Sequence, residues 1–549
     1  MSKKIVFLFL LVNFHLFCQT PNWAWAKSAG GIDSDNGSRI ETDLNGNVFV
    51  SGFFQSATID FGNTTLTNSS PGSNDYFLVK FDQDGNVIWA ISAGGDLDDE
   101  IYGLSIDTGG NIIVTGRFNS SILPIGTTTL VNSGIYDIFT VKYDPDGNVL
   151  WAKKSGGSLK DEGLSASTDL NNNIIVTGFF SSSTITFGSS NLYTAGGADM
   201  FIVKYDPNGN VLWAKSEGGT GIDYGTCAST DNSGNIFVTG FFASSSILFG
   251  STLVNNSNQS CTDVFLLKYD SNGNILWVKT AGGSNHEVGS SLETDNNGNV
   301  ILVGYYISPT IAFGTTTLTN VGTASTNDGF VVKYNSNGQE LWAKSIAGNN
   351  SDVIADITID NIGNAYISGL FASSSLNTGN TSLLNAGAVS TYDVFVVKYD
   401  SLGNDIWALS EGDSSNESGN SLALNDVGDI FVTGQFQSSS INFGATTLTN
   451  SGNNTEEMFV GKLAFLSASL TLNVSSSNFS VQPNPTNGLV TISGLKPFGQ
   501  NRIMLYTISG EKMDEFITPE SEMELNLEMY ATGMYFLRFQ DQVIRIVKN

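Results

Sequence analysis

Short apolar runs separated by five-residue turns dominate the pattern along residues 20–463. Within each run, small or polar side chains alternate with branched or aromatic ones, as in half-buried β-strands. Residues 164–180 (LSASTDLNNNIIVTGFF) and 200–216 (MFIVKYDPNGNVLWAKS) show one design twice: a run, a turn of the D-x-x-G-N kind and a second run. Such turns close β-hairpins, because Asp caps backbone N–H groups and Gly adopts positive φ. We predict hairpins throughout and find no run typical of a helix.

The hairpins recur with a period of 62 to 65 residues, and one tryptophan marks each period. A period holds two hairpins, and a unit of four antiparallel strands fits one blade of a β-propeller. We therefore predict an all-β fold in which residues 20–463 form a seven-bladed β-propeller of four-stranded blades. We expect the tryptophans to pack between adjacent blades. They are Trp25, Trp89, Trp151, Trp213, Trp277, Trp342 and Trp407.

The four-strand repeat does not begin with its first strand at the start of the chain. The first turn of the period occurs seven times and the second only six times, because the last apolar run, ending at Leu463, has no turn after it. Residues 22–28 (NWAWAKS) form a tryptophan run with no partner before them. We predict that this N-terminal strand completes the last blade, which ties the chain ends together and removes an exposed sheet edge.

The repeat resembles that of the secreted β-propeller family usually called SBBP. The resemblance rests on the patterns W-A-K-x-x-G-G, D-x-x-G-N-x-x-V-T-G-x-F and D-x-F-v-x-K-Y-D, which recur from about Trp25 to Leu463. Ile125 and Thr378 depart from it, since the other repeats carry Phe before Gly at this place. The resemblance implies a propeller and no particular activity.

The first 19 residues differ from the repeat. Lys3 and Lys4 precede an apolar run, Ile5 to Phe17, that is too short and too early to span a membrane. We predict a signal peptide over residues 1–19. The alternative is a lipoprotein acylated on its first cysteine, which requires a small residue where this chain has Phe17. No later apolar run reaches the ~18 residues that cross a bilayer, so we expect an exported protein without a transmembrane span.

The repeat ends at Leu463, and the residues after it have a different pattern. Residues 464–478 indicate a linker, and the runs within 479–549 indicate a small β-sandwich with Pro and Gly at its turns. This segment resembles the type A C-terminal sorting domain of the type IX secretion pathway. The resemblance implies the type IX machinery as a partner and a place outside the cell or on its outer surface. It rests on Pro483, Asn484, Pro485, Gly488, Gly510, Gly533, Tyr535, Arg545 and Lys548.

Composition excludes several classes of partner and one kind of metal centre. The formal net charge of -28 argues against nucleic acid and against anionic membranes as partners. Two histidines exclude a multi-histidine metal centre. His286 is a lone histidine beside Glu287, and we expect a solvated side chain there instead of a general base. We expect a monomer.

A carboxylate stands ten residues after every marking tryptophan. Each lies in the connection from an outer strand to the next innermost strand, so the set should ring one mouth of the central channel. One hypothesis is a repeated brace, in which each carboxylate accepts backbone N–H bonds of its own loop. The other is a cation site, with calcium as the cofactor. We favour the brace and assign no cofactor. The seven are Asp35, Asp99, Asp161, Asp223, Glu287, Asp352 and Glu417.

Cys227 and Cys261 remain in the exported chain. One predicted strand separates them, which places direct neighbours ~9–10 Å apart and beyond disulfide reach. A folded-back loop before Cys261 would bring them together, so a bridge stays an alternative in an oxidising compartment.

The sequence shows no nucleophile paired with a base and no glycine loop that cradles phosphate. We therefore favour a non-enzymatic binding or adhesion propeller with an extracellular protein or glycan as ligand. Its long connections, such as residues 55–75, lie on one face with the carboxylates, and varied loops on a rigid scaffold usually bind. The alternative is a polysaccharide-active enzyme that uses carboxylates at the channel mouth.

Overall fold

The computed structural model describes residues 20–323, 325–387, 390–452, 454–465, 480–493, 495, 501–507, 512–539 and 542–548. The chain divides into two compact units, Met1–Phe465 and Leu466–Asn549. All regular elements in the described residues are β-strands. The expected signal peptide, the linker beyond Phe465 and Gly510 lie outside the described residues.

Each period of the sequence forms a four-stranded antiparallel sheet, as predicted. Six of these sheets take their strands in chain order. They are β2 (Asp35–Thr42), β3 (Val48–Phe54), β6 (Asp75–Phe81) and β7 (Val87–Ala93); β8 (Asp99–Ile106), β9 (Ile112–Phe118), β12 (Asp137–Tyr143) and β13 (Val149–Ser155); β14 (Asp161–Thr168), β15 (Ile174–Phe180), β18 (Asp199–Tyr205) and β19 (Val211–Glu217); β20 (Asp223–Thr230), β21 (Ile236–Phe242), β24 (Asp263–Tyr269) and β25 (Ile275–Ala281); β26 (Glu287–Thr294), β27 (Val300–Tyr306), β30 (Asp328–Tyr334) and β31 (Glu340–Ile346); β32 (Asp352–Ile359), β33 (Ala365–Phe371), β36 (Asp393–Tyr399) and β37 (Asp405–Glu411).

The remaining sheet joins the two ends of this unit. It contains β38 (Glu417–Leu424), β39 (Ile430–Phe436), β42 (Glu457–Ala464) and β1 (Asn22–Ala29). The N-terminal strand pairs antiparallel with β42, from Asn22 opposite Ala464 to Ala29 opposite Met458. The predicted closure by the N-terminal strand is therefore present.

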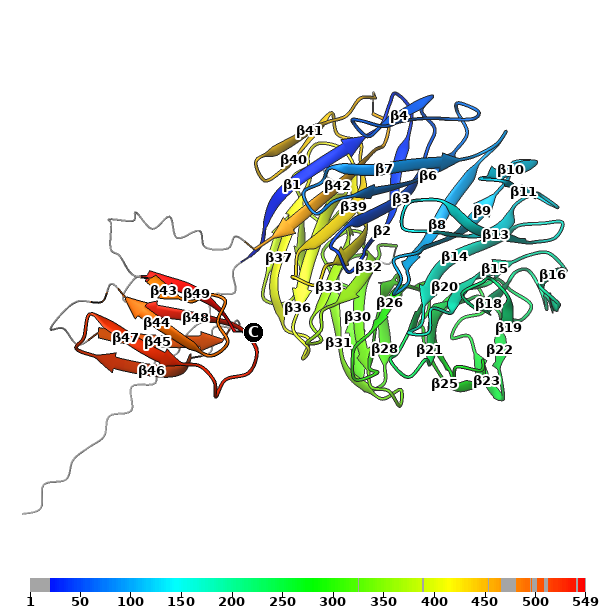
Figure 1. Cartoon of the computed structure of the whole chain (residues 1–549). Helices are drawn as coiled ribbons and strands as arrows, with labels where there is room; N and C mark the ends of the chain where they lie inside the picture. The colour runs from blue at the N-terminus through cyan, green and yellow to red at the C-terminus, as the bar shows by residue number, and fades with distance from the viewer. Residues whose placement is uncertain are drawn as a thin grey trace, which may run out of the picture. The chain divides into compact units, whose positions relative to one another are not determined.

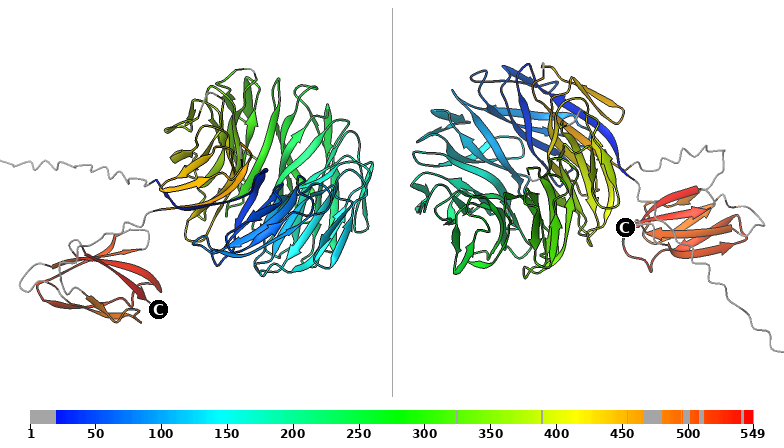
Figure 2. Two further views of the ribbon diagram at one scale, coloured as in Figure 1. Left: turned by 90° about the horizontal axis from the view of Figure 1, so that it is seen from above. Right: turned by 180° about the vertical axis from the view of Figure 1, so that it is seen from behind.

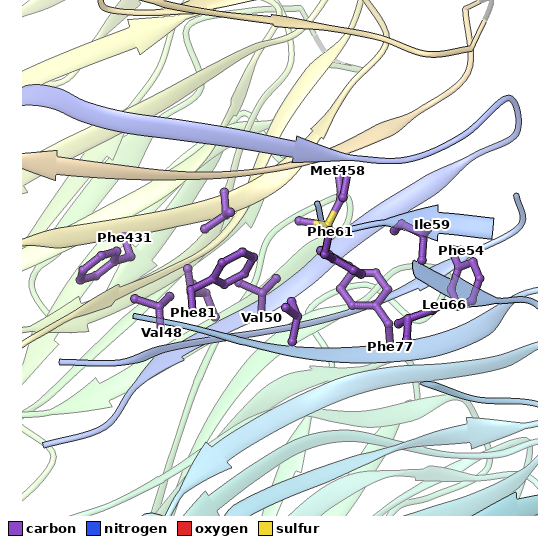
Figure 3. Close-up of a cluster of buried hydrophobic side chains, with 14 of the residues drawn as sticks. Val48, Val50, Phe54, Ile59, Phe61, Leu66, Phe77, Phe81, Phe431 and Met458 are labelled. Atoms are coloured by element: carbon purple, nitrogen blue, oxygen red, sulfur yellow. The ribbon is translucent and has the colours of Figure 1, made fainter. Parts of the chain in front are cut away.

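The sheets follow one another around a common centre (Figure 1, Figure 2). Their first strands contact each other in sequence, and β38 contacts β2, so the circuit is closed. A shared core seals the closing junction: Phe431 and Met458 of the last sheet pack with Val48, Phe77 and Phe81 of the β2 sheet (Figure 3). Because each sheet buries both faces against neighbours, its second and third strands are almost wholly buried.

The marking tryptophans pack between neighbouring blades, as expected. The Trp89 ring lies against Gly147 of the next blade's turn, and Trp89 Nε1 donates to the Pro145 carbonyl at 3.2 Å. Trp151, Trp213, Trp277, Trp342 and Trp25 repeat this arrangement. Trp407 differs, because the blade that it faces has no turn between its third and fourth strands. These strands are β42 and β1, from opposite ends of the propeller sequence. Trp407 Nε1 is buried without a hydrogen-bond partner among the described residues.

The long connections between second and third strands are largely β-hairpins and not free loops. They are β4 (Thr58–Asp60) with β5 (Thr65–Thr67), β10 (Ile122–Ile125) with β11 (Thr128–Val131), β16 (Thr184–Phe187) with β17 (Ser190–Tyr193), β22 (Ser246–Phe249) with β23 (Thr252–Asn255), β28 (Thr310–Phe313) with β29 (Thr316–Thr319), β34 (Ser375–Asn377) with β35 (Ser382–Leu384), and β40 (Ser440–Phe443) with β41 (Thr446–Thr449). Each hairpin buries apolar side chains in its blade's core; Ile59, Phe61 and Leu66 do so for the first. The surface left for binding is therefore smaller than the loop lengths indicate.

The second unit contains two sheets around one apolar core. One sheet joins β43 (Ser480–Gln482), β44 (Leu489–Ser493) and β47 (Glu522–Asn526); the other joins β46 (Lys512–Thr518), β45 (Asn501–Thr507), β48 (Gly533–Phe539) and β49 (Gln542–Lys548). Leu505 and Leu537 are fully buried in that core. The Pro483 and Pro485 peptide bonds are cis.

Candidate functional site

The seven predicted carboxylates begin the first strands of the blades instead of standing in loops. All are at most 1% exposed. Asp99 is typical: it accepts hydrogen bonds from Gly95 N at 2.8 Å and from Ser120 N and Oγ at 3.3 and 2.6 Å. The carboxylate thereby joins the preceding loop to the start of the hairpin connection. This is the geometry that the brace hypothesis expects.

The same brace recurs around the circuit. Asp35, Asp161, Asp223, Asp352 and Glu417 each accept hydrogen bonds from a serine hydroxyl 21 residues later. Glu287 accepts from Gly283 N at 2.9 Å. Burial raises the pKa of Asp35 to about 6 and that of Asp99, Asp352, Glu287 and Glu417 to about 7. Within the described residues, no group of three or more His, Cys, Asp or Glu side chains is placed to hold a metal ion.

A second set of carboxylates, which sequence reasoning missed, begins the third strands. Its members are Asp75, Asp137, Asp199, Asp263, Asp328, Asp393 and Glu457, all at most 3% exposed. In Asp75, one oxygen accepts from Ser69 N at 2.6 Å, and the other is buried without a partner among the described residues. The first Asp of the D-x-F-v-x-K-Y-D pattern belongs to this set, but only the strand register shows which residues that Asp faces.

The two sets meet between neighbouring blades. Asp99 N donates to the Asn74 carbonyl at 2.6 Å, which brings Asp99 beside Asp75 of the preceding blade. The corresponding hydrogen bond is present at every junction. In chain order, the first runs from Asp35 N to the Glu456 carbonyl and the last from Glu417 N to the Tyr392 carbonyl. Burial raises the pKa of Asp75, and the facing carboxylate raises that of Asp99 further. Each junction therefore places two acids together in a region shielded from water.

The first strands enclose a cavity of about 250 Å³ on the axis. Nine of its 22 lining residues are Ser or Thr, and four charged residues break the repeat: Arg39, Glu41, Glu293 and Asp356. Asp356 accepts from Ser291 Oγ at 2.8 Å and Ser421 Oγ at 2.6 Å. Burial, with Glu293 and Asp356 nearby, raises the pKa of Glu41 to about 8. This cavity was not predicted, although the aligned repeats show charged residues replacing Ser at these strand positions.

The side chains next to the carboxylate ring differ from blade to blade. We call this set the mouth layer: the second residue of each first strand and the residue directly opposite it on the second strand. The opposed pairs are Asn36 and Phe53, Glu100 and Arg117, Glu162 and Phe179, Tyr224 and Phe241, Val288 and Tyr305, Val353 and Leu370, and Ser418 and Gln435.

Three sectors of the mouth layer differ clearly in chemistry. Arg117 forms ion pairs with Glu100 and Glu162, both at 2.9 Å. Phe179 stacks on Tyr224 with ring centroids 3.7 Å apart. Amide side chains fill the sector where β38, β39 and β2 meet, since Asn420 Nδ2 donates to Gln435 Oε1 at 2.9 Å. Identical backbone positions therefore present charged, aromatic and amide surfaces in turn.

Both cysteines are free, so the alternative of a bridge is wrong. Cys227 lines the axial cavity and contacts Ser165 and Ser291. Cys261 Sγ donates to the Ser284 carbonyl at 3.7 Å. The loop before Cys261 forms its own turn, with Cys261 N donating to Asn258 O at 2.9 Å, and does not fold back toward the strand that carries Cys227.

The five-residue turns are capped as predicted. Asp82 Oδ1 accepts from Asp84 N and Asn86 N at 2.9 and 2.8 Å, and Gly85 adopts φ 79°. Because the turn aspartate is fixed by donors on its own backbone, these hydrogen bonds account for its repetition. His286 is exposed, and its Nδ1 accepts from Thr262 N at 3.2 Å.

The predicted sorting residues gather at the ends of strands in the second unit. Asn484 Oδ1 accepts from Val547 N at 2.9 Å, and Tyr535 OH donates to the Ala531 carbonyl at 2.6 Å. Lys548 Nζ donates to the Glu528 carbonyl at 3.2 Å. Gly488 and Gly533 have φ of 150° and 157°. These residues fix loops to strands within the unit.

Residues 480–549 match the family described as the secretion system C-terminal sorting domain. The protein is therefore delivered by type IX secretion to the cell surface or the extracellular space. No helix in the described residues is long and apolar enough to span a bilayer.

An uncharacterized WD repeat-containing protein of Acanthamoeba polyphaga mimivirus is 26% identical over 507 residues, covering 76% of this chain and 36% of that protein. The regulatory protein FlaEY of Caulobacter vibrioides is 30% identical over 108 residues, covering 20% of this chain and 11% of that protein. The chain thus spans about a third or less of these curated relatives. Together, the blade topology and the WD-repeat relative define the class: a β-propeller repeat protein with a sorting domain.

Two solved structures resemble the chain at low identity. The WD40 domain of Neurospora crassa Pan2 has a TM-score of 0.32 and 10% identity, covering 63% of this chain and 94% of that one. A mutant apocarotenoid oxygenase of Synechocystis has a TM-score of 0.38 and 11% identity, covering 79% and 95%. Likeness at this level carries no conclusion about activity.

Proposed function

We propose that this chain is an exported, non-enzymatic binding protein whose ligand site is the mouth layer with the adjoining loops. Its parts are a signal peptide over residues 1–19, a seven-bladed propeller of the SBBP type over 20–463, and a sorting β-sandwich over 479–549. The sorting-domain match supports the export, and the WD-repeat relative supports a binding role.

The variation of the mouth layer carries the proposal. The turns, the tryptophans and both carboxylate sets keep one chemistry around the circuit, as structural positions do. The mouth layer instead changes from ion pair to aromatic stack to amides at fixed register. Varied side chains presented on a rigid scaffold are typical of recognition surfaces.

The test compares binding of the full mature chain with that of two variants. Labelled protein is incubated with extracellular polysaccharide and with whole bacterial cells. Tyr224→Ser with Tyr305→Ser, in the mouth layer, should abolish retention. Leu44→Ser with Leu170→Ser, at exposed five-residue turns, should leave it unchanged. Equal retention of both double variants would overturn the proposal.

A polysaccharide-active enzyme is the alternative function. Such an enzyme needs a carboxylate that touches substrate, and the seven brace carboxylates are buried under their own loops. The axial acids Glu41, Glu293 and Asp356 line the cavity on the axis. Reproducible cleavage of a polysaccharide panel that Glu41→Gln abolishes would favour the enzyme.

A further inference from the structure

A pocket of about 320 Å³ opens in the amide sector of the mouth layer. Its wall combines Gln435 and Gln437 of the β39 end with Asn416 and Glu456 from flanking loops, and Tyr392 stands at the neighbouring blade. Asn416 is exposed, so the pocket is open to solvent. The volume lies within the range of small-molecule sites.

A network of amides fixes this wall. Asn36 Nδ2 donates to Gln435 Oε1, which also accepts from Asn420 Nδ2 at 2.9 Å. Asn416 Nδ2 donates to Gln437 Oε1 at 3.0 Å, while Asn416 Oδ1 accepts from Tyr392 N at 3.2 Å. Because each amide is held by a neighbour, the side chains are positioned before any ligand arrives.

The network leaves polar groups for a ligand. Among the described residues, the Gln437 Nε2 donor and the Tyr392 hydroxyl have no hydrogen-bond partner in the protein. Glu456 also lines the pocket, and burial raises the pKa of its carboxyl. The pocket also contains the apolar side chain of Leu370 beside the Tyr392 ring.

These groups match one ligand chemistry better than others. Amide groups donate and accept hydrogen bonds at close range, as adjoining sugar hydroxyls do, and an aromatic ring with a leucine suits the C–H face of a pyranose. The pocket lining has no Lys or Arg, so an anionic ligand lacks a counter-charge there. β39 is paired on both sides, so a peptide cannot add to it as a strand.

We propose that this pocket is a subsite for a neutral saccharide. The inference rests on the proposed function, because it names the ligand class for one sector of the mouth layer. The amides hydrogen-bond adjacent hydroxyls, and Tyr392 stacks on the sugar ring.

The repeat supplies substitutions that another blade already carries at the same position. Gln435→Leu copies Leu370, and Gln437→Ala copies Ala372; in the β32 blade these residues lie directly before and directly after the last residue of β33. The control is Leu44→Ser with Leu170→Ser, at exposed five-residue turns outside the mouth layer. All variants should therefore fold, and their melting temperatures verify it.

Calorimetry of the full mature chain tests the proposal with neutral oligosaccharides derived from β-glucan, xylan, mannan and chitin, with an oligouronate, and with an uncharged peptide. At least one neutral oligosaccharide should bind, and Gln435→Leu with Gln437→Ala should weaken it at least tenfold while the control binds normally. Preference for the oligouronate or the peptide, or unchanged neutral-sugar affinity in the pocket variant, overturns the saccharide subsite. If that variant still adheres to cells while Tyr224→Ser with Tyr305→Ser does not, the inference fails and the proposed function stands. If the wild-type chain binds nothing, both fail.

Discussion

Asp99 and Asp75 come from neighbouring blades and meet because the Asp99 amide donates to the carbonyl of Asn74, directly before Asp75. One oxygen of Asp75 is buried without a partner among the described residues. Two buried carboxyls at one junction repel when both are ionised, so the junction favours holding a proton. The paired carboxyls at the blade junctions therefore make the stability of the propeller depend on pH.

We predict that the propeller is more stable in mild acid than in mild base. Burial raises the pKa of Asp99 and Asp352 to about 7, whereas an unfolded aspartate titrates near pH 4. The folded state therefore binds these protons more tightly. The stability that this provides is complete below about pH 4 and is lost as pH rises through about 7. The melting temperature should fall between about pH 5 and pH 8.

The turn aspartates provide the internal check on this prediction. Their capping hydrogen bonds lower the pKa of residues such as Asp144 and Asp206, so their stabilisation is lost only in stronger acid. Asp75→Asn places a permanently neutral amide at one junction and should flatten the slope between pH 5 and pH 8. The exposed turn variant Asp144→Asn should not change that slope. A melting temperature that rises with pH over this interval would contradict the account.

A second prediction concerns the brace. Asp161 accepts from Gly157 N, Ser181 N, Ser182 N and Ser182 Oγ, at 2.7 to 3.1 Å. Asp161→Asn removes acceptor capacity and should lower the free energy of unfolding by about 1–3 kcal/mol. The loss should be the same in millimolar calcium and in excess chelator, as thermal melts can measure. A calcium-dependent shift that the variant abolishes would show that the carboxylates hold a cation instead.

A third prediction uses the one tryptophan that faces the chain ends. Trp342 Nε1 donates to the Ser401 carbonyl at 3.2 Å, whereas Trp407 Nε1 is buried without a partner among the described residues. Both Trp→Phe variants lose ring volume, but only Trp342→Phe also loses a hydrogen bond. Trp342→Phe should therefore cost ~1 kcal/mol more than Trp407→Phe in chemical denaturation. Equal costs would mean that the turn carbonyl contributes nothing.

A fourth prediction concerns export. The propeller and the sorting unit have separate apolar cores, so removal of residues 480–549 should leave the propeller folded. The truncated chain should accumulate in the periplasm, where cell fractionation detects it. Lys548→Ala, which loses the bond to the Glu528 carbonyl, is the milder variant. Normal surface levels of the truncated chain would refute the role of the sorting domain.

The blades were predictable because their contacts repeat in the sequence. Trp89, the turn glycine Gly147 and the carboxylate Asp99 occur at fixed spacing, and such spacing reports a repeated contact. The hairpin connections were not, because runs such as Thr58–Asp60 are too short to show a strand period. Their buried residues pack by tertiary contact with the blade.

The candidate site was harder to predict for a related reason. Gln435, Leu370 and Arg117 occupy one repeat position, so a search for recurring residues discards them as variation. Only the register, which opposes Gln435 to Ser418 and Arg117 to Glu100, shows that they surround one mouth. Likewise, strand order alone left the pairing of Cys227 with Cys261 open, and the local turn at Asn258 decided it.

The central claim is that ligand binds at the mouth layer and not at the five-residue turns. Hydrogen exchange of the full mature chain, with and without the neutral oligosaccharide that binds most tightly, tests it most directly. The account predicts slower exchange in residues 412–418 and 435–439 around the amide pocket and unchanged exchange in the turn at 425–429 of the same blade. Protection confined to the turns, or no protection anywhere in the propeller, would contradict it.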